Sequence, residues 1–337
     1  RTKLVARDVS IYKKVEKYME VGIGYWIGFF AFVLVMLALD LGVFHKNNEA
    51  PTMKESLLWS AFWIGLAFIF AGGLWFFTGG DHALDFVTAY LLEKSLSIDN
   101  LFIFILVFGF FGIELKYQHR LLFWGVFGAL VMRVIFIFGG AALLHHFAWL
   151  MYIFGAFLIV TGVKMLFEKE EAQDLNDSFI IKSLRKILPL KEDVAEPHFL
   201  VKENGKRYAT QFLLALLFIE ASDLLFAVDS IPAVLAVTQD TFIVVTSNIF
   251  AIMGLRSLYF ALSGILPMFR YIKYALAVIL AFIGVKMVLN ESAKAFDWHF
   301  HISNVVSLTV IVGLLTLSII ASVIVSRVQE RRKFKAK

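Results

Sequence analysis

The chain contains no cysteine, and charged residues make up only 18% of its 337 residues. Without cysteine it has no disulfide, thiolate metal ligand, iron–sulfur cluster or cysteine nucleophile. Soluble proteins are about one quarter charged, so this shortage, together with 60% hydrophobic residues, predicts a protein embedded in lipid. Thirty-six phenylalanines and seven tryptophans agree, because aromatic side chains suit lipid contact and the membrane interface. The net charge of +5 does not indicate nucleic-acid binding, since most basic residues lie in loops and tails.

Long apolar stretches predict an all-α, polytopic membrane protein, because a bilayer crossing requires about 20 mostly apolar residues. Nine stretches qualify: 21–44, 57–78, 86–111, 121–144, 147–167, 208–237, 241–266, 274–289 and 302–326. The resulting organisation is a basic tail (1–20), two leading spans (21–78), a three-span unit (86–167), a polar loop (168–207), a second three-span unit (208–289), a last span (302–326) and a basic tail (327–337).

The loop 168–207 carries eight basic and nine acidic residues. Within it, the sequence Glu-Asn-Gly-Lys at 203–206 lies between alternating apolar and polar residues. This pattern predicts a β-hairpin with a type I′ turn.

Lysine and arginine outside the spans are shared unevenly between the two sides of the membrane. The side with loop 168–207 and the C-terminal tail has twenty of them, and the other side has seven. The positive-inside rule therefore predicts a cytoplasmic loop and C-terminus, with the N-terminus outside. The tail 1–20 contributes six of the seven and argues against this orientation. One interpretation is an amphipathic segment lying on the membrane surface.

The two three-span units resemble each other. Each has an acidic span, a span with one arginine, and a span ending in Gly-Val-Lys-Met. Because each unit has an odd number of spans, the second must be inverted in the membrane. Inverted repeats are common in secondary transporters, whose substrate sites lie near the midplane at the repeat interface. The equivalent pairs are Asp99 and Asp229, Arg133 and Arg256, and Lys164 and Lys286.

Carboxylates inside the spans are the main evidence for function, because a charge at a span centre costs about 2.5–3.5 kcal/mol even on a lenient scale. Neutral oxygens accompany them, and an oxygen site without cysteine suits a hard divalent cation such as Mn²⁺, Mg²⁺ or Ca²⁺. Pro232 predicts a helix break beside Asp229, which would let the acidic groups converge. The carboxylates are Asp40, Glu93, Asp99, Glu220, Asp223 and Asp229, and the neutral groups include Ser97, Asn100, Ser230 and Asn248.

Basic residues within the spans have a structural and a functional interpretation. Arg133 and Arg256 are the only charges in their spans, and we expect them to pair with carboxylates or to take part in gating. We expect Lys164 and Lys286, near span ends, to extend to the interface. Lys94 is interpreted as neutralising the adjacent Glu93. Asp40, near the end of the first span, has both an interfacial and a site interpretation.

Three segments carry a resemblance to the TerC/Alx family of integral membrane proteins: Glu-Lys-Ser-Leu-Ser-Ile-Asp-Asn at 93–100, the sequence from Glu220 to Ala233, and Thr246 to Arg256. The resemblance covers essentially residues 25–325. It implies a bacterial inner-membrane protein that exports Mn²⁺ through its motif carboxylates. Transferred to this chain, it implies the metal ligands Glu93, Asp99, Asn100, Glu220, Asp223 and Asp229. Asp40, Ser97, Ser230 and Asn248 are further candidates, either as metal ligands or as residues of the ion pathway.

The resemblance therefore implies a Mn²⁺ exporter. We expect it to work by alternating access and to be driven by an ion gradient, since no nucleotide-binding motif is present. We expect no enzymatic activity, catalytic residue or prosthetic group, and only the metal ion and the lipid bilayer as partners. The pseudo-two-fold axis should gather Glu93, Asp99, Asp223 and Asp229 into one cage of four carboxylates. Two alternatives stay open: a membrane-protein assembly factor, and an intramembrane aspartyl protease using Asp99 and Asp229. The oligomeric state is open as well.

Overall fold

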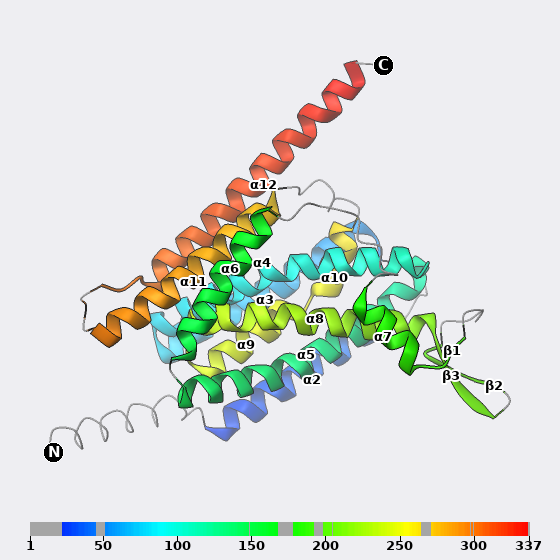
Figure 1. Cartoon of the computed structure of the whole chain (residues 1–337), viewed down its shortest axis with the longest axis horizontal. Helices are drawn as coiled ribbons and strands as arrows, with labels where there is room; N and C mark the ends of the chain where they lie inside the picture. The colour runs from blue at the N-terminus through cyan, green and yellow to red at the C-terminus, as the bar shows by residue number, and fades with distance from the viewer. Residues whose placement is uncertain are drawn as a thin grey trace.

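A computed structural model describes residues 22–44, 51–147, 149–167, 178–191, 198–203, 205–263, 271–296, 298 and 300–335, so the predicted basic tail 1–20 lies outside the described residues. The helices (Figure 1) are α2 (Ile23–Phe44), α3 (Met53–Thr78), α4 (Gly80–Phe110), α5 (Leu115–His146), α6 (Leu150–Phe167), α7 (Phe179–Ile187), α8 (Gln211–Leu235), α9 (Thr241–Ile252), α10 (Leu255–Leu262), α11 (Ile272–Phe296) and α12 (Asn304–Lys335). The strands are β1 (Leu190–Lys191), β2 (Leu200–Glu203) and β3 (Lys206–Thr210).

Side-chain caps determine where several of these helices begin. Thr52 and Glu55 form a capping box at the start of α3, in which each side chain accepts a hydrogen bond from the other's backbone N–H. Asp240 accepts hydrogen bonds from two backbone N–H groups at the start of α9. These contacts satisfy N–H groups that the first turn of a helix leaves unpaired.

Eight helical segments in the described part of the chain are long and apolar enough to cross a membrane. Their outer surfaces carry large apolar side chains, such as Ile69 at 72% exposed and Phe76 at 83% exposed, which suit contact with lipid. The remaining long helix, α4, has 31 residues but is too rich in charge to qualify. It packs against α3, α8, α9 and α12, inside the bundle. The prediction of an all-α, polytopic membrane protein is confirmed.

Helices α6 and α11, which are equivalent in the predicted repeat, pack with their backbones in contact. A Cβ added at Gly162 would lie 2.5 Å from the carbonyl oxygen of Ala277, and one added at Gly155 would lie 3.0 Å from that of Gly284. Gly155 and Ala277 are 122 residues apart in the sequence, as are Gly162 and Gly284. Each contact is therefore the symmetry counterpart of the other. The contact position falls along α11 as it rises along α6, so the two helices are antiparallel.

Helices α4 and α8, the acidic members of the two units, are also antiparallel. Asn100 of α4 donates to Asp223 of α8. Near the start of α4, Asp85 accepts from Asn304, which also donates to the carbonyl of Val237, just beyond the end of α8. Equivalent helices that run in opposite directions are what an inverted repeat requires.

The helix break predicted beside Asp229 is wrong. Helix α8 continues to Leu235 with Pro232 inside it, so Glu220, Asp223 and Asp229 stay on one continuous helix. The break lies instead in the stretch predicted as a single span at 241–266. Gly254 has φ 81° and separates α9 from α10. An added Cβ there would lie 2.7 Å from the ring of Trp63 in α3, so both the backbone conformation and the packing favour glycine.

The polar loop forms a small layer at one end of the bundle. Strands β2 and β3 pair antiparallel, with Glu203 opposite Lys206, so a hairpin lies at the residues where the sequence predicts one. Strand β1 pairs parallel with β3. Helix α7 buries Ile181 and exposes Phe179. The second half of α12 lies beside the start of α11, since Ser322 accepts from the backbone N–H of Tyr271.

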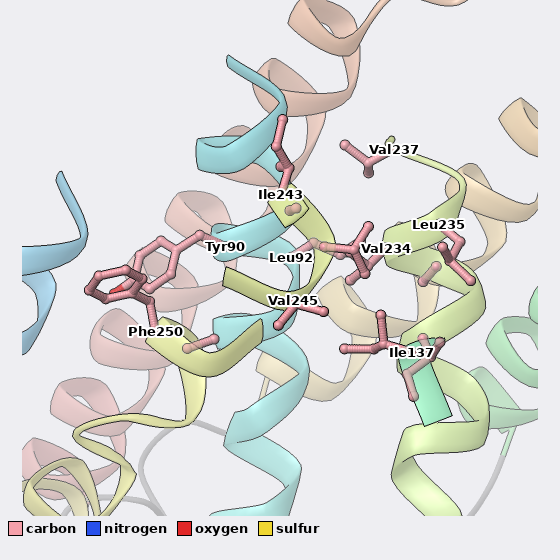
Figure 2. Close-up of a cluster of buried hydrophobic side chains, with 14 of the residues drawn as sticks. Tyr90, Leu92, Ile137, Val234, Leu235, Val237, Ile243, Val245 and Phe250 are labelled. Atoms are coloured by element: carbon pink, nitrogen blue, oxygen red, sulfur yellow. The ribbon is translucent and has the colours of Figure 1, made fainter. Parts of the chain in front are cut away.

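A buried apolar layer lies between the two ends of α4 (Figure 2). Four helices contribute to this layer, with Leu92 from α4, Val234 from α8, Val245 from α9 and Ile137 from α5. All four side chains are completely buried. This layer lies next to the polar residues at the centre of the bundle, because Leu92 directly precedes Glu93.

The contact between α6 and α11 generates a stability prediction. The change Gly162→Ala forces a Cβ against backbone atoms of α11, and we expect it to lower the free energy of unfolding by about 1–3 kcal/mol. The matched control is Gly72→Ala in α3, where an added Cβ meets no atom within 4 Å. We expect the control to be neutral or to stabilise by up to about 1 kcal/mol. Unfolding of the purified variants in detergent measures both, and equal effects would contradict the packing.

Candidate functional site

Arg133 of α5 is buried at the centre of the bundle, with 2% of its surface exposed. Its guanidinium forms an ion pair with Glu93 of α4. It also makes a two-pronged contact with Asp223 of α8, with Nη2 at 2.8 Å from Oδ1 and Nε at 3.2 Å from Oδ2. Nη1 lies 3.4 Å from the Oδ1 atom of Asn248 in α9. One cation therefore joins the four helices at the interface of the two units.

Neutral polar groups surround this ion-paired centre. Asn100 donates from Nδ2 to Oδ1 of Asp223 at 2.9 Å. The Oδ1 atom of Asn100 and the hydroxyls of Ser97 and Ser230 are buried without a hydrogen-bond partner in the structure. Glu93 and Asp223 are 130 residues apart, as are Asn100 and Ser230. The centre thus has two equivalent carboxylates and two equivalent neutral groups, and its unpartnered oxygens are suited to accept a further cation.

Glu220 lies one helical turn before Asp223 on α8 and is half-buried. Its carboxylate rests against Gly128 of α5, where an added Cβ would lie 2.0 Å from Oε1. The charges of Glu220 and Asp223 interact. Within the described part of the chain no ion pair to Glu220 is formed. Among the described residues, this carboxylate next to the centre therefore has no cationic partner, and a glycine makes room for it.

The predicted cage of four carboxylates is wrong. Within the described ranges, no three histidine, cysteine, aspartate or glutamate side chains gather as a metal site. Asp99 and Asp229 are half-buried, and they interact electrostatically with Lys273 and Lys164 respectively. The reason is helical geometry: six residues turn a helix by roughly 240°, so Asp99 faces away from Glu93 while α4 stays regular. The centre instead gathers Glu93 and Asp223 around Arg133.

A second ion pair lies beside the helix break. Arg256 of α10 contacts Asp40 of α2, with Nη2 at 2.7 Å from Oδ1 and at 2.7 Å from the carbonyl oxygen. Lys94 donates to the carbonyl of Ala251 at 3.0 Å, at the end of α9. The interpretation that Lys94 neutralises Glu93 is therefore wrong, because Glu93 pairs with Arg133. Asp40, Lys94 and Arg256 together hold the broken helix in place.

A third polar network, which the sequence did not indicate, lies at the end of the bundle opposite the sheet. Asn304 of α12 donates to Asp85 of α4 and accepts from Lys286 of α11, each at 2.5 Å. Lys286 is 1% exposed, so the expectation that it extends to the interface is wrong. The only available signal was that Asp85 directly precedes a predicted span, which made it resemble an ordinary loop residue.

Comparison with known proteins agrees with this architecture. Residues 78–330 match the family described as integral membrane protein TerC family. The chain belongs to the TerC family. The matched range contains every residue of the Arg133 centre, whereas Asp40 and Trp63 lie outside it.

Similar proteins occur in several bacteria. An uncharacterized membrane protein of Myxococcus xanthus, STKORF319, is 48% identical over 304 residues, which cover 90% of this chain and 93% of that protein. An uncharacterized membrane protein of Rickettsia felis is 44% identical over 299 residues, covering 89% and 97%. A protein of Escherichia coli K12 named "Putative membrane-bound redox modulator Alx" is 43% identical over 304 residues, covering 88% and 92%. No solved structure matches the chain significantly.

The pair of Asp40 and Arg256 generates a prediction about folding of this TerC protein. Their side chains are 13% and 3% exposed, and removing one partner of a buried pair typically costs about 3–5 kcal/mol. We expect Asp40→Asn and Arg256→Gln each to lower the yield of folded protein. The double variant should recover part of that loss, because it leaves no unpaired charge.

The exposed pair of Glu114 and Lys116 provides the control, since Glu114→Gln should change the yield little. Yield by fluorescence-detected size exclusion is the measurement. A double variant that folds as poorly as the sum of both single variants would contradict the pairing.

Proposed function

We propose that this protein transports a divalent metal cation, Mn²⁺ in the first place, out of the cytoplasm. The observation that carries the proposal is the pair of equivalent carboxylates, Glu93 and Asp223, buried between two inverted units. A bilayer-embedded protein retains such charges where they serve a substrate or ion pathway. Substrate sites of secondary transporters lie at the same place, near the midplane at the repeat interface.

The chemistry of the centre supports a hard cation. Two carboxylates supply the charge, and Asn100 and Ser230 supply neutral oxygens of the kind that Mn²⁺, Mg²⁺ and Ca²⁺ accept. The choice of Mn²⁺ among these rests on the resemblance of the motif segments to the TerC/Alx family. Asp99 and Asp229 adjoin Asn100 and Ser230 in the sequence, and we assign them to the pathway by which the ion reaches or leaves the centre.

Alternating access accounts for the remaining features. Helices α4, α5, α8 and α9 rearrange against the close-packed pair of α6 and α11, driven by an ion gradient, and expose the centre first to one side and then to the other. The apolar layer around Leu92 and Val234 separates the centre from the network of Asp85, Asn304 and Lys286. The broken helix between α9 and α10 supplies a point where the backbone can bend.

The alternatives lack such a supporting observation. An aspartyl protease requires Asp99 and Asp229 to act as a pair, but the charge of each interacts with a different lysine. An assembly factor would not require a buried pair of carboxylates. The redox name of the E. coli relative cannot extend to thiol chemistry in this chain, which has no cysteine.

The proposal predicts that the charges of the centre are essential for export. Glu93→Gln and Asp223→Asn keep the shape of each side chain and remove one charge from the ion's surroundings. We expect each to reduce Mn²⁺ export at least about tenfold. Mn²⁺ accumulation in cells that lack their own exporter measures this, with protein amount determined in the same cells.

The surface variant Glu114→Gln is the matched control and should export normally. If both centre variants export at the normal rate, the transport proposal is wrong. If they lose only the insertion of other membrane proteins, the assembly factor is favoured.

The proposed location is the bacterial inner membrane, with loop 168–207 and the C-terminus in the cytoplasm and the N-terminus outside. The end of α6, which leads into the loop, lies beside the start of α11, and Tyr271 there contacts Ser322 of the last helix, which supports a common side for the loop and the last helix. Reporter tags in the loop and at the C-terminus should therefore both give a cytoplasmic signal. Opposite signals from the two tags would contradict nine crossings, and two external signals would reverse the orientation.

A further inference from the structure

We propose that Arg133 is a built-in counter-cation: it occupies the ion site when no metal is bound, and it moves to Glu220 when the metal enters. This inference rests on the proposed function and adds how the site exchanges one cation for another. It assigns to Glu220 the role of the alternate partner of Arg133.

The carboxylate oxygens of the centre are already occupied by N–H donors. Oδ1 of Asp223 accepts from both Arg133 and Asn100, and Oδ2 accepts from Arg133. Glu93 is ion-paired with the same guanidinium. A metal that binds these carboxylates must take over the oxygens that now face N–H donors. The guanidinium and a divalent ion cannot share them, because like charges repel strongly in a low-dielectric interior.

Glu220 lies on the side of Asp223 toward which the displaced side chain of Arg133 would move. Contacts between α5 and α8 rise together along both helices, since Gly125 lies beside Ile219, Gly128 beside Glu220 and Gly140 beside Ile231. Glu220 is thus about 4.5 Å nearer the start of α8 than Asp223. Side chains on a helix lean toward its N-terminus. The side chain of Arg133 on α5 therefore leans toward the level of Glu220.

The carboxylate of Glu220 is available as a partner for Arg133. It has no ion pair among the described residues, whereas Glu93, Asp223 and Asp40 each contact an arginine. Its half-buried carboxylate occupies the space that the missing side chain of Gly128 leaves free. A long arginine that leaves Asp223 can reach this carboxylate without a change in the backbone, and it stays paired throughout.

The experiment measures Mn²⁺ affinity of the purified full chain in detergent by isothermal titration calorimetry. If Arg133 competes with the metal, Arg133→Gln should bind Mn²⁺ at least about tenfold more tightly than the unmodified protein. Lys116→Gln is the matched control, because it removes an exposed cation whose partner, Glu114, lies outside the centre. The control should leave the affinity unchanged. A lower or equal affinity of folded Arg133→Gln overturns the proposal.

The role of Glu220 is tested by a second pair of variants. Glu220→Gln should weaken Mn²⁺ binding about tenfold, because the displaced arginine loses its partner. The same change should have no effect in the Arg133→Gln background. If Glu220→Gln weakens binding equally in both backgrounds, Glu220 is a direct metal ligand and its assignment here is wrong.

Two further outcomes keep the test decisive. Arg133→Lys keeps a cation without the two-pronged contact, and it should show an affinity between those of the unmodified protein and Arg133→Gln. It replaces Arg133→Gln if that variant does not fold, and an affinity no higher than that of the unmodified protein overturns the proposal. If neither the unmodified protein nor any folded variant binds Mn²⁺, the proposed function fails, whereas binding without the predicted order of affinities removes only this inference.

Discussion

A positive charge in the middle of a bilayer has to be paired, and the pairing of Arg133 organises the centre of this protein. Four helices each supply one group: α5 the guanidinium, α4 and α8 a carboxylate each, and α9 an amide. Neither carboxylate would be tolerated there alone. The same interaction accounts for the position of α4, whose charges exclude it from the lipid-facing ring and draw it into the bundle. The interface between the two units is therefore polar at its centre and apolar around it.

The two units share one order of helices, but they differ in the break between α9 and α10 and in the partners of their charges. Arg133 and Arg256 occupy corresponding positions, yet Arg133 pairs across the repeat interface and Arg256 pairs with Asp40 of α2. Helix α2 belongs to neither unit. The leading helices thus supply a counter-charge that the second unit lacks, and they support the broken helix through Trp63. This asymmetry gives the buried centre one arginine, Arg133, and leaves Arg256 to pair with Asp40 beside the broken helix.

The sequence predicted the features that depend on composition and on local spacing. The membrane class, the repeat with its inversion, the hairpin at residues 203–206 and the candidate residues of the site all follow from such patterns. The family match over residues 78–330 confirms the resemblance. Whether Pro232 or Gly254 breaks its helix was beyond the sequence, because packing against Trp63 decides it. The facing of Asp99 depended on α4 staying regular, and the partners of Lys94 and Lys286 come from distant segments, so no local pattern could identify them.

The backbone contact between α6 and α11 limits how the molecule can change shape. Carbonyl groups of one helix lie directly against glycine Cα atoms of the other, so no side chains separate the two backbones. Helices can slide past each other by small changes in the side chains between them, and here that adjustment is missing. Helices α6 and α11 therefore form one rigid pair, which includes one helix from each unit. Any rearrangement must then leave this pair of helices intact and take place in the helices that carry Arg133 and its partners. The backbone contact between α6 and α11 thus provides a rigid reference, and the helices of the charged centre can move relative to it.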